Sequence, residues 1–151
     1  MKEVDTPADM DALAGQTLGS SDWLTVTQDM IDRFADATGD HQWIHVDRAR
    51  AAREMPGGHT IAHGFLTLSL LPQLSQGVYR IRKRSRGINY GSNKVRFTHP
   101  VPAGSRVRLH LALKAAEKIE GGRRLIFDNT VEIEGEARPA LVAETLTLVF
   151  D

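Results

Sequence analysis

Apolar residues change their spacing about halfway along the chain. In the first half they recur every three or four positions between residues 28 and 38, which predicts a helix with one buried face. Thr27 precedes this stretch as a helix cap, and Gly39 follows it as a stop. A shorter capped helix is predicted after Thr6, and a brief strand is predicted over 23–26.

The segment 60–74 is apolar on nearly every side. Leucine, isoleucine, alanine and phenylalanine occupy most of its positions and leave almost no polar face. Exposing any face of such a helix to water would be unfavourable, so the pattern predicts a buried central helix of about 21 Å. Pro72 is expected to kink or end it.

The second half of the chain alternates apolar and polar residues with period two. This alternation predicts strands over 106–114, over 125–133 after a Glu-Gly-Gly turn, over 141–150 and over 88–97. Short helices, one buried helix and a long antiparallel meander follow one another along the chain. The expected fold class is α+β, with a curved antiparallel sheet wrapped around a long buried central helix.

Length and composition indicate one ordinary globular domain over residues 1–151. Hydrophobic residues make up 41% and charged residues 25%, and there are no cysteines. Disulfides, thiolate zinc sites and a cysteine nucleophile are therefore excluded. The N-terminus shows no signal-peptide pattern and no run reaches the roughly 18 apolar residues of a membrane span. We expect a cytoplasmic protein with no membrane partner.

The charges are balanced overall but unevenly distributed. The chain has 19 Lys+Arg and 19 Asp+Glu, yet no acidic residue occurs between Met55 and Ala116, where ten basic residues lie. Half of these form the basic segment, residues 80–86: Arg80, Arg82, Lys83, Arg84 and Arg86. The segment is either a solvated face balanced by acids nearby in space or a site for a phosphate-bearing ligand. Overall neutrality argues against a nucleic-acid partner.

Four of the six histidines lie close together in the sequence. They form two His-x3-His pairs, at His41 and His45 and at His59 and His63. A metal site would need each pair on a helical turn, but nearby glycines and proline place both pairs in loops or helix starts. No glutamate lies inside either pair. The pattern therefore disfavours a metal.

Acid–base chemistry is the stronger hypothesis for this region. Asp40 and His45, brought together across the turn after Gly39, could hold a water and move its protons. The alternative is an acid at a helix end beside a packed histidine. His63 and Gly64 open the apolar helix, where main-chain N–H groups lack intrahelical partners and favour negative charge. Gly64 would let a ligand approach closely, or it would only ease helix packing.

Three segments resemble the MaoC-like (R)-specific enoyl-CoA hydratases. Thr-Gly-Asp-His-Gln-Trp-Ile-His over 38–45 is similar to their hydratase signature, Ser/Thr-Gly-Asp-x-Asn-Pro-aliphatic-His. Residues 61–65 resemble the second family motif, and 89–101 the strand that follows it. Gln42 and Trp43 replace the usual Asn-Pro, as in the NodN-like branch. This departure is expected to change loop packing and substrate choice more than the reaction.

The resemblance implies a single hot-dog fold and a homodimer with its sites near the subunit interface. It also implies reversible syn hydration of a trans-2-enoyl-CoA to the (R)-3-hydroxyacyl-CoA, with the acyl-CoA as substrate and no further cofactor or metal. By motif position, Asp40 and His45 are the catalytic pair and Gly64 binds the thioester oxygen. Supporting roles fall to three residues: Gln42, His63 and Ser69.

Several questions stay open at this level. The substrate carrier could be acyl carrier protein, as in a 3-hydroxyacyl dehydratase of fatty-acid synthesis, and a non-catalytic hot-dog subunit is a further alternative. A hot-dog thioesterase is disfavoured because the Asp-x4-His motif is intact. If the basic segment borders the site, Arg82, Lys83 and Arg84 are expected to bind the phosphates of coenzyme A.

Overall fold

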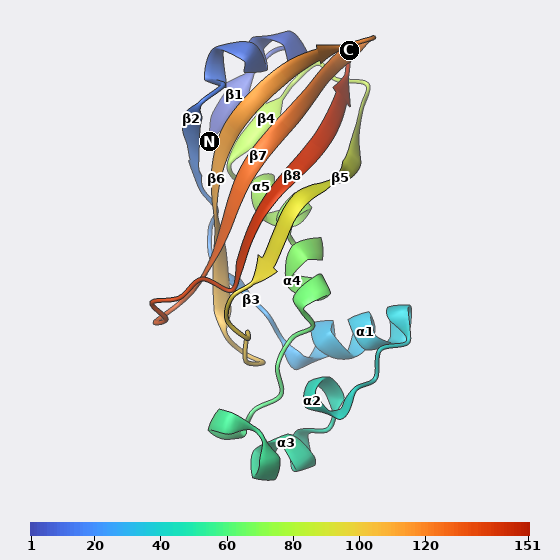
Figure 1. Cartoon of the computed structure of the whole chain (residues 1–151), viewed down its shortest axis with the longest axis vertical. Coiled ribbons are helices and arrows are strands. Elements are labelled where there is room, and N and C mark those ends of the chain that lie inside the picture. Colours follow the sequence, from blue (N-terminus) through green and yellow to red (C-terminus); the bar gives the residue numbers. More distant parts are fainter.

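Six strands form one curved antiparallel sheet in the computed structural model, which describes all residues Met1–Asp151 (Figure 1). The strand order is β2-β6-β7-β8-β5, and β3 pairs with the other end of β6. The strands are β2 (Gln16–Ser20), β3 (Leu24–Thr25), β5 (Arg86–Phe97), β6 (Arg106–Ile119), β7 (Gly122–Ile133) and β8 (Leu141–Phe150). The four long strands predicted from the alternating pattern are confirmed.

Strands β6 and β7 show how the sequence builds the sheet. Alternate residues of β7 from Leu125 to Ile133 are buried, as its period of two requires. A tight hairpin joins the two strands, with Gly121 in the left-handed region at φ +72°. At Gly122 a Cβ atom would lie 2.0 Å from the carbonyl oxygen of Val149, so only glycine fits there.

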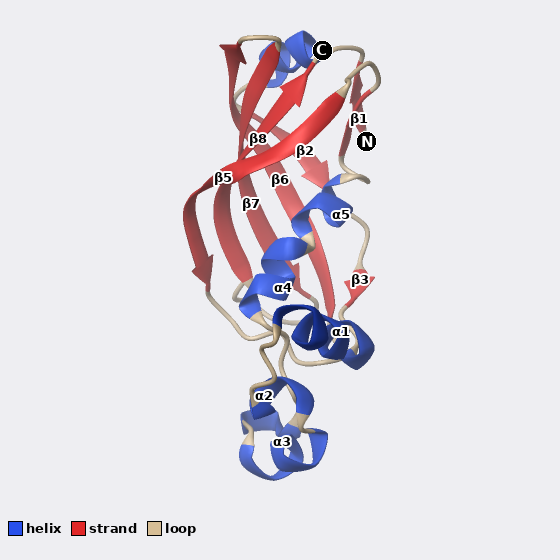
Figure 2. Cartoon of the chain, turned by 90° about the vertical axis from the view of Figure 1, so that its right-hand side faces the viewer, coloured by secondary structure: helices blue, strands red, loops and turns tan.

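Two short helices occupy the place of the long central helix. These are α4 (Gly64–Ser69) and α5 (Leu71–Ser75), which lie along the concave side of the sheet (Figure 2). The helix is interrupted at Leu70 because Pro72 has no N–H to donate and its ring clashes with the preceding turn. The prediction that this segment is buried on every side is wrong at Phe65, which is 66% exposed, because the sheet covers only one side of α4.

The main hydrophobic core lies between the sheet and these two helices. Leu109, Leu113 and Leu125 of the sheet are fully buried, and Leu66 and Leu74 of the helices join the same cluster. Burying such side chains stabilises the fold by about 1.5–3 kcal/mol each. This packing fixes where the N-terminus of α4 points.

Three helices lie beyond one end of the sheet (Figure 1). They are α1 (Gln28–Thr38), α2 (Trp43–Val46) and α3 (Arg48–Glu54). The predicted limits of α1 are confirmed: the Met30 N–H donates to the Thr27 hydroxyl oxygen, and Gly39 ends the helix at φ +80°. Two 3-10 helices cover Pro7–Leu13, the capped turn predicted after Thr6, and Pro56–Gly58.

A small second sheet joins the N-terminus to the basic segment. Strand β1 (Lys2–Val4) pairs in parallel with β4 (Tyr79–Ile81), and neither strand was predicted from the sequence. Both strands are three residues long, which is too short for a periodic signal. No helix is both long and apolar enough to cross a membrane.

Candidate active site

The turn after α1 places Asp40 against the start of α2. Gly39 reverses the chain in the left-handed conformation, and the Gln42 N–H then donates to Asp40 Oδ1 at 3.3 Å. Helix α2 carries His45 one turn later. The Asp-x4-His spacing therefore brings an acid and an imidazole to one side of a turn, as the acid–base hypothesis requires.

His45 is held by the main chain in one tautomer. Its ring is buried, and Nδ1 lies 2.7 Å from the carbonyl oxygen of Ile61. A carbonyl oxygen only accepts, so Nδ1 carries the proton and donates it. This leaves Nε2 unprotonated, with a lone pair that can accept a proton.

His63 stacks on His45 and completes the site. The two ring centroids are 3.8 Å apart with an interplanar angle of 25°. His63 Nε2 donates to the main-chain oxygen of Asp40 at 2.9 Å, while its Nδ1 is buried without any partner. A buried nitrogen without a partner is unfavourable unless a water or ligand satisfies it. His63 thus ties the helix α4 end to the Asp40 turn.

Asp40, His45 and His63, the site cluster, lie close enough to share one small molecule. One nitrogen or carboxylate oxygen from each lies within 4.8 Å of the others. Burial lowers the pKa of His45 below its usual 6.5, and the nearby His63 lowers it further, while the hydrogen bond to the Ile61 carbonyl oxygen and, less strongly, the Asp40 carboxylate oppose the shift. His45 is therefore neutral at pH 7 and suited to act as a base.

The geometry of the site cluster does not suit a shared metal ion. Nitrogen lone pairs lie in the ring plane, so two nearly parallel stacked rings direct them side by side rather than toward one point. The other histidines of the two pairs do not join the cluster. His41 bonds Asp36 at 2.9 Å, and His59 lines a separate cavity of about 380 Å³.

Gly64 stands at the first position of α4, directly after His63. A Cβ atom at this position would lie 2.9 Å from the ring of Phe97, so packing alone requires glycine here. Its N–H is among those at the helix start that have no intrahelical partner. The packing role left open by the sequence is thus real, and binding of a thioester oxygen by this N–H stays a prediction.

Gln28 is a site residue that the sequence did not reveal. Its Nε2 donates to the main-chain oxygen of His45 and to Asp32 Oδ1, both at 2.8 Å. Its Oε1 accepts from the buried Thr60 hydroxyl, next to Ile61, whose carbonyl holds the His45 ring. One side chain on α1 therefore joins both segments that orient His45. No sequence pattern indicated these contacts, which span 17 and 32 residues.

A cavity of about 1000 Å³ lies between the helices α4–α5 and the sheet. Ser69, at the exposed end of α4, lines this cavity and not the site cluster. Ser69 is therefore placed to contact a bound substrate, and its supporting role stays a prediction. The side chain of Gln42 is exposed and makes no hydrogen bond, so Gln42 contributes to the cluster through its main chain: its N–H donates to Asp40 Oδ1, and its carbonyl oxygen accepts from the His45 N–H at 3.0 Å.

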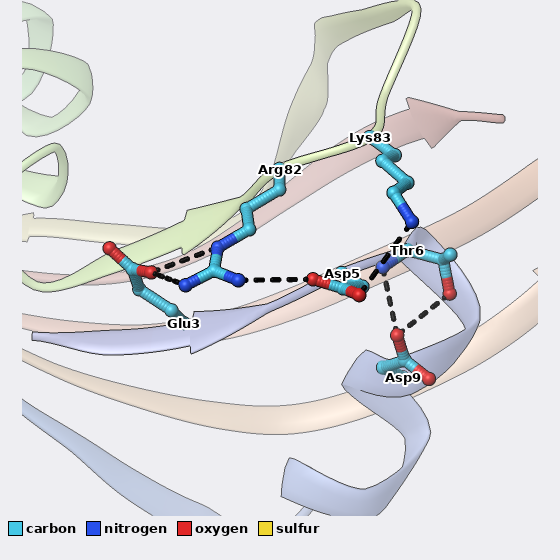
Figure 3. A network of polar contacts seen from close by, with 6 residues as sticks. All are labelled: Glu3, Asp5, Thr6, Asp9, Arg82 and Lys83. Carbon is cyan, nitrogen blue, oxygen red and sulfur yellow. Dashed lines mark hydrogen bonds and ion pairs between the residues drawn. The ribbon is translucent and has the colours of Figure 1, made fainter.

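The basic segment divides into paired and unpaired charges. Arg82 Nε donates to Glu3 at 3.0 Å and its guanidinium also reaches Asp5, which Lys83 contacts as well (Figure 3). The solvated-face interpretation with acids nearby in space therefore describes Arg82 and Lys83. Arg84 has no carboxylate partner and lines the large cavity, as does Arg80. Of the three predicted coenzyme A contacts, Arg84 is the one left with an uncompensated charge.

Comparison with known proteins agrees with this architecture. Residues 9–134 match the MaoC like domain. The chain is 52% identical over 147 residues to 3-hydroxyacyl-thioester dehydratase Z of Mycobacterium tuberculosis, covering 97% of each chain. It is 51% identical over 148 residues to nodulation protein N of Rhizobium leguminosarum bv. viciae, covering 95% of this chain and 91% of that protein.

A solved structure supports the fold independently. The unliganded R-hydratase PhaJ1 from Pseudomonas aeruginosa superposes with a TM-score of 0.72 at 23% identity, covering 91% of this chain and 82% of that one. At this identity the likeness concerns the fold. It confirms the hot-dog architecture expected from the sequence motifs.

Proposed function

Because the chain belongs to the MaoC-like dehydratase family, we propose that it catalyses the reversible syn hydration of trans-2-enoyl-CoA to (R)-3-hydroxyacyl-CoA. The observation that carries the proposal is the tautomer of His45. Its Nδ1–H is committed to the Ile61 carbonyl oxygen, so Nε2 carries the free lone pair, and a ring nitrogen of His45 lies within 4.8 Å of an Asp40 carboxylate oxygen. A neutral buried imidazole next to an acid is the arrangement that general acid–base catalysis uses.

In the forward direction a water lies between Asp40 and His45 Nε2. His45 accepts one proton from it, and the oxygen forms a bond to the β-carbon of the enoyl group. The electron pair of the double bond moves toward the thioester oxygen, where the Gly64 N–H donates a hydrogen bond to the developing negative charge. The proton that His45 accepted passes to the Asp40 carboxylate and from there to the α-carbon, so one water is added across the double bond and both side chains return to their starting states.

His63 supports this step through geometry. Its stacked ring fixes one face of His45, and its bond to the Asp40 main chain holds the acid at that distance. The proposed reaction uses no resident metal or redox cofactor, and the coenzyme A thioester is the substrate.

The proposed assembly is a homodimer formed at the edge strand β5. This strand pairs only with β8, and nearly all of its residues are exposed. Large apolar side chains are among them, with Ile88 at 45%, Tyr90 at 60% and Phe97 at 44% exposure. A long exposed edge of this kind is a site for pairing with a second chain. Since Phe97 packs on Gly64, such an interface would lie beside the active site.

Direct assay tests the proposal. Purified protein is incubated with trans-2-enoyl-CoA of several chain lengths and with the same enoyl groups on acyl carrier protein, and the product is resolved on a chiral column. The expected result is hydration of the coenzyme A substrates with an (R)-3-hydroxyacyl product. Preference for the carrier-protein substrate would identify a dehydratase of fatty-acid synthesis instead. An (S) product, or no turnover on either carrier, contradicts the proposal.

A further inference from the structure

The wall of the large cavity that the sheet forms carries polar side chains at positions where a hydrophobic core would have apolar ones. Along the inner face of β7 the buried residues run Leu125, Phe127, Asn129, Val131 and Ile133, with one amide in an otherwise apolar row. Around Asn129 the neighbouring strands add further polar groups to the cavity lining: Asn89, Ser92, Thr145 and Thr147. A buried amide in an apolar row is costly unless all of its polar atoms are satisfied.

The Asn129 amide is only half satisfied by the protein. Its Nδ2 lies 3.2 Å from the carbonyl oxygens of Phe127 and Ala143 and 2.9 Å from Thr145 Oγ1. Carbonyl oxygens only accept, so the nitrogen must face them and the amide orientation is determined. The oxygen Oδ1 then accepts from no protein group.

This oxygen is reached from the cavity. His63 Nδ1 is the only fully buried side-chain nitrogen or oxygen without a partner, so the unpartnered Asn129 Oδ1 retains accessible surface. Asn129 as a whole is 3% exposed and lines the cavity, which is therefore where that surface lies. The Thr145 hydroxyl oxygen accepts from Nδ2, and its own proton donates to no protein group.

We propose that Asn129 and Thr145 form a subsite that binds a hydrogen-bond donor carried by the thioester substrate. This inference rests on the proposed function. The same chemistry has two possible sources, namely a hydroxyl group on the acyl chain or an amide of the pantetheine arm. Either group would donate to Asn129 Oδ1, and a hydroxyl would also accept from Thr145. The subsite then selects its substrate, because a substrate without the donor leaves the buried oxygen unpaired.

The cavity is placed to receive either part of the substrate. Leu68 and Ser69 of α4 line it, and the same helix begins at Gly64 beside the site cluster. At a rise of about 1.5 Å per residue, Ser69 is one and a half turns from the proposed thioester position. A group several bonds from the reacting carbons would therefore lie in this cavity, which Asn129 lines from the sheet side.

Two pairs of substrates distinguish the sources. The first pair is a trans-2-enoyl-CoA and its ω-hydroxy analogue of equal length, over a series of lengths. The second pair is the crotonyl thioester of pantetheine and that of ethanethiol, which lacks both amides. We expect wild-type kcat/KM to favour the donor-bearing member by about tenfold in one of the pairs, and Asn129→Leu to bring that ratio close to one while the other ratio stays unchanged.

Two further variants provide a second test of the subsite and a matched control. Thr145→Val preserves shape and should reduce the same ratio by about threefold, even if Asn129→Leu folds poorly. Thr130→Val, on the opposite face of β7, should keep the wild-type ratio. If the kcat/KM ratio falls toward one for the enoyl-CoA and its ω-hydroxy analogue, the subsite binds the acyl chain. If it falls toward one for the pantetheine and ethanethiol thioesters, the subsite binds the pantetheine arm. Ratios that survive both Asn129→Leu and Thr145→Val overturn the proposal.

A binding measurement separates this inference from the proposed reaction. Calorimetric titration with the saturated ω-hydroxyacyl-CoA and with saturated butyryl-pantetheine needs no turnover. Affinity that falls about tenfold in Asn129→Leu for at least one of these ligands supports the subsite even if no hydration is found: a fall for the ω-hydroxyacyl-CoA alone indicates the acyl hydroxyl, and a fall for both indicates the pantetheine arm. Equal affinities in wild type and Asn129→Leu for both ligands overturn it, even if the enzyme hydrates crotonyl-CoA.

Discussion

The site cluster, carried by α2 and the start of α4, and the basic segment, which begins in β4, lie in different halves of the molecule and hold their polar groups in different ways (Figure 1). In the site cluster, both histidines are buried and donate to main-chain carbonyl oxygens. In the basic segment, side chains meet side chains in solvent, and the paired Arg82 remains 57% exposed. The first region is positioned by the path of the backbone, and the second by ion pairs between solvent-exposed side chains.

This difference determines what each region can do. Main-chain oxygens move only when the fold moves, so the His45 ring keeps its orientation at any ionic strength. Exposed ion pairs contribute about 0–1 kcal/mol and are screened over a Debye length of about 8 Å at physiological salt. Changes in the site cluster should therefore alter kcat, whereas changes in the basic segment should alter KM.

The largest expected effect is the loss of the catalytic pair. Asp40→Asn keeps the shape of the side chain but removes the acid, and His45→Gln removes the base. Each should lower kcat/KM for hydration of crotonyl-CoA by at least about a hundredfold, because a positioned acid or base contributes about 10²–10⁴-fold. Steady-state kinetics on folded variants, checked by circular dichroism, measures this.

The matched control is a histidine outside the site cluster. His41 is exposed and bonds Asp36, so His41→Gln should retain nearly the wild-type rate. Turnover close to wild type in Asp40→Asn or His45→Gln would remove the basis for the proposed mechanism.

A smaller loss is expected at Gln28, which positions His45 without touching substrate. Gln28→Ala leaves the His45 carbonyl oxygen without its donor and should lower kcat about tenfold, with KM changed less than twofold. Gln28→Glu keeps the acceptor for Thr60 but cannot donate to His45, so it should not restore the rate. Gln73→Ala, on the exposed side of α5, is the neutral comparison.

The test of Gln28 must distinguish an effect on kcat from a loss of protein stability. Assays well below the unfolding temperature separate the two, because a merely structural residue would lower the unfolding midpoint and leave kcat of the folded enzyme intact. Unchanged kcat in Gln28→Ala would reduce this residue to a structural role.

The pH dependence of kcat/KM tests the protonation state of His45 in the unmodified protein. Burial and the neighbouring His63 lower its pKa, so the neutral base persists below pH 6.5 in the folded enzyme. The acid limb of kcat/KM should therefore have its midpoint below 6.5, and at pH 6.5 the enzyme should retain more than half of its maximal value. A midpoint above 6.5 would mean that the two groups that raise the pKa, the Ile61 carbonyl oxygen and the Asp40 carboxylate, outweigh burial.

The long strands could be predicted because their signal is local. Alternation along 106–114 or 125–133 needs no knowledge of the partner strand. Strands β1, β2 and β4 could not be predicted, since each is short and β2 buries only Leu18. The central helix was predicted too long because its apolar composition does not reveal that residues 60–63 are extended or that the sheet covers one side only.

The site could be predicted only in part, for a related reason. Asp40 and His45 lie five residues apart and share a motif, so the sequence identified them. The contribution of Gln28, and the contact of His63 with the Asp40 main chain, pass through carbonyl oxygens that every residue carries. No side-chain pattern records which carbonyl a folded chain will present, and these contacts become visible only with the backbone path.

The smallest expected effect separates the two kinds of arginine in the basic segment. Arg84 has no carboxylate partner, whereas Arg82 is neutralised by Glu3 and Asp5. Arg84→Ala should raise KM for enoyl-CoA about three- to tenfold with little change in kcat, because a phosphate contact binds substrate and transition state alike. Arg82→Ala should raise KM less, since its charge is already compensated. Steady-state kinetics at low salt measures both.

Salt and a truncated substrate complete this test. Added salt should raise the wild-type KM toward that of Arg84→Ala, because the phosphates and an exposed guanidinium attract each other through screened solvent. An enoyl-pantetheine thioester carries no phosphate, so neither salt nor Arg84→Ala should change its kinetics. Equal losses on both substrates would instead assign Arg84 to the fold or to the subunit contact. A larger KM effect in Arg82→Ala than in Arg84→Ala would mean that the ion pairs with Glu3 and Asp5 open when coenzyme A binds, and the division between paired and unpaired charges would then fail.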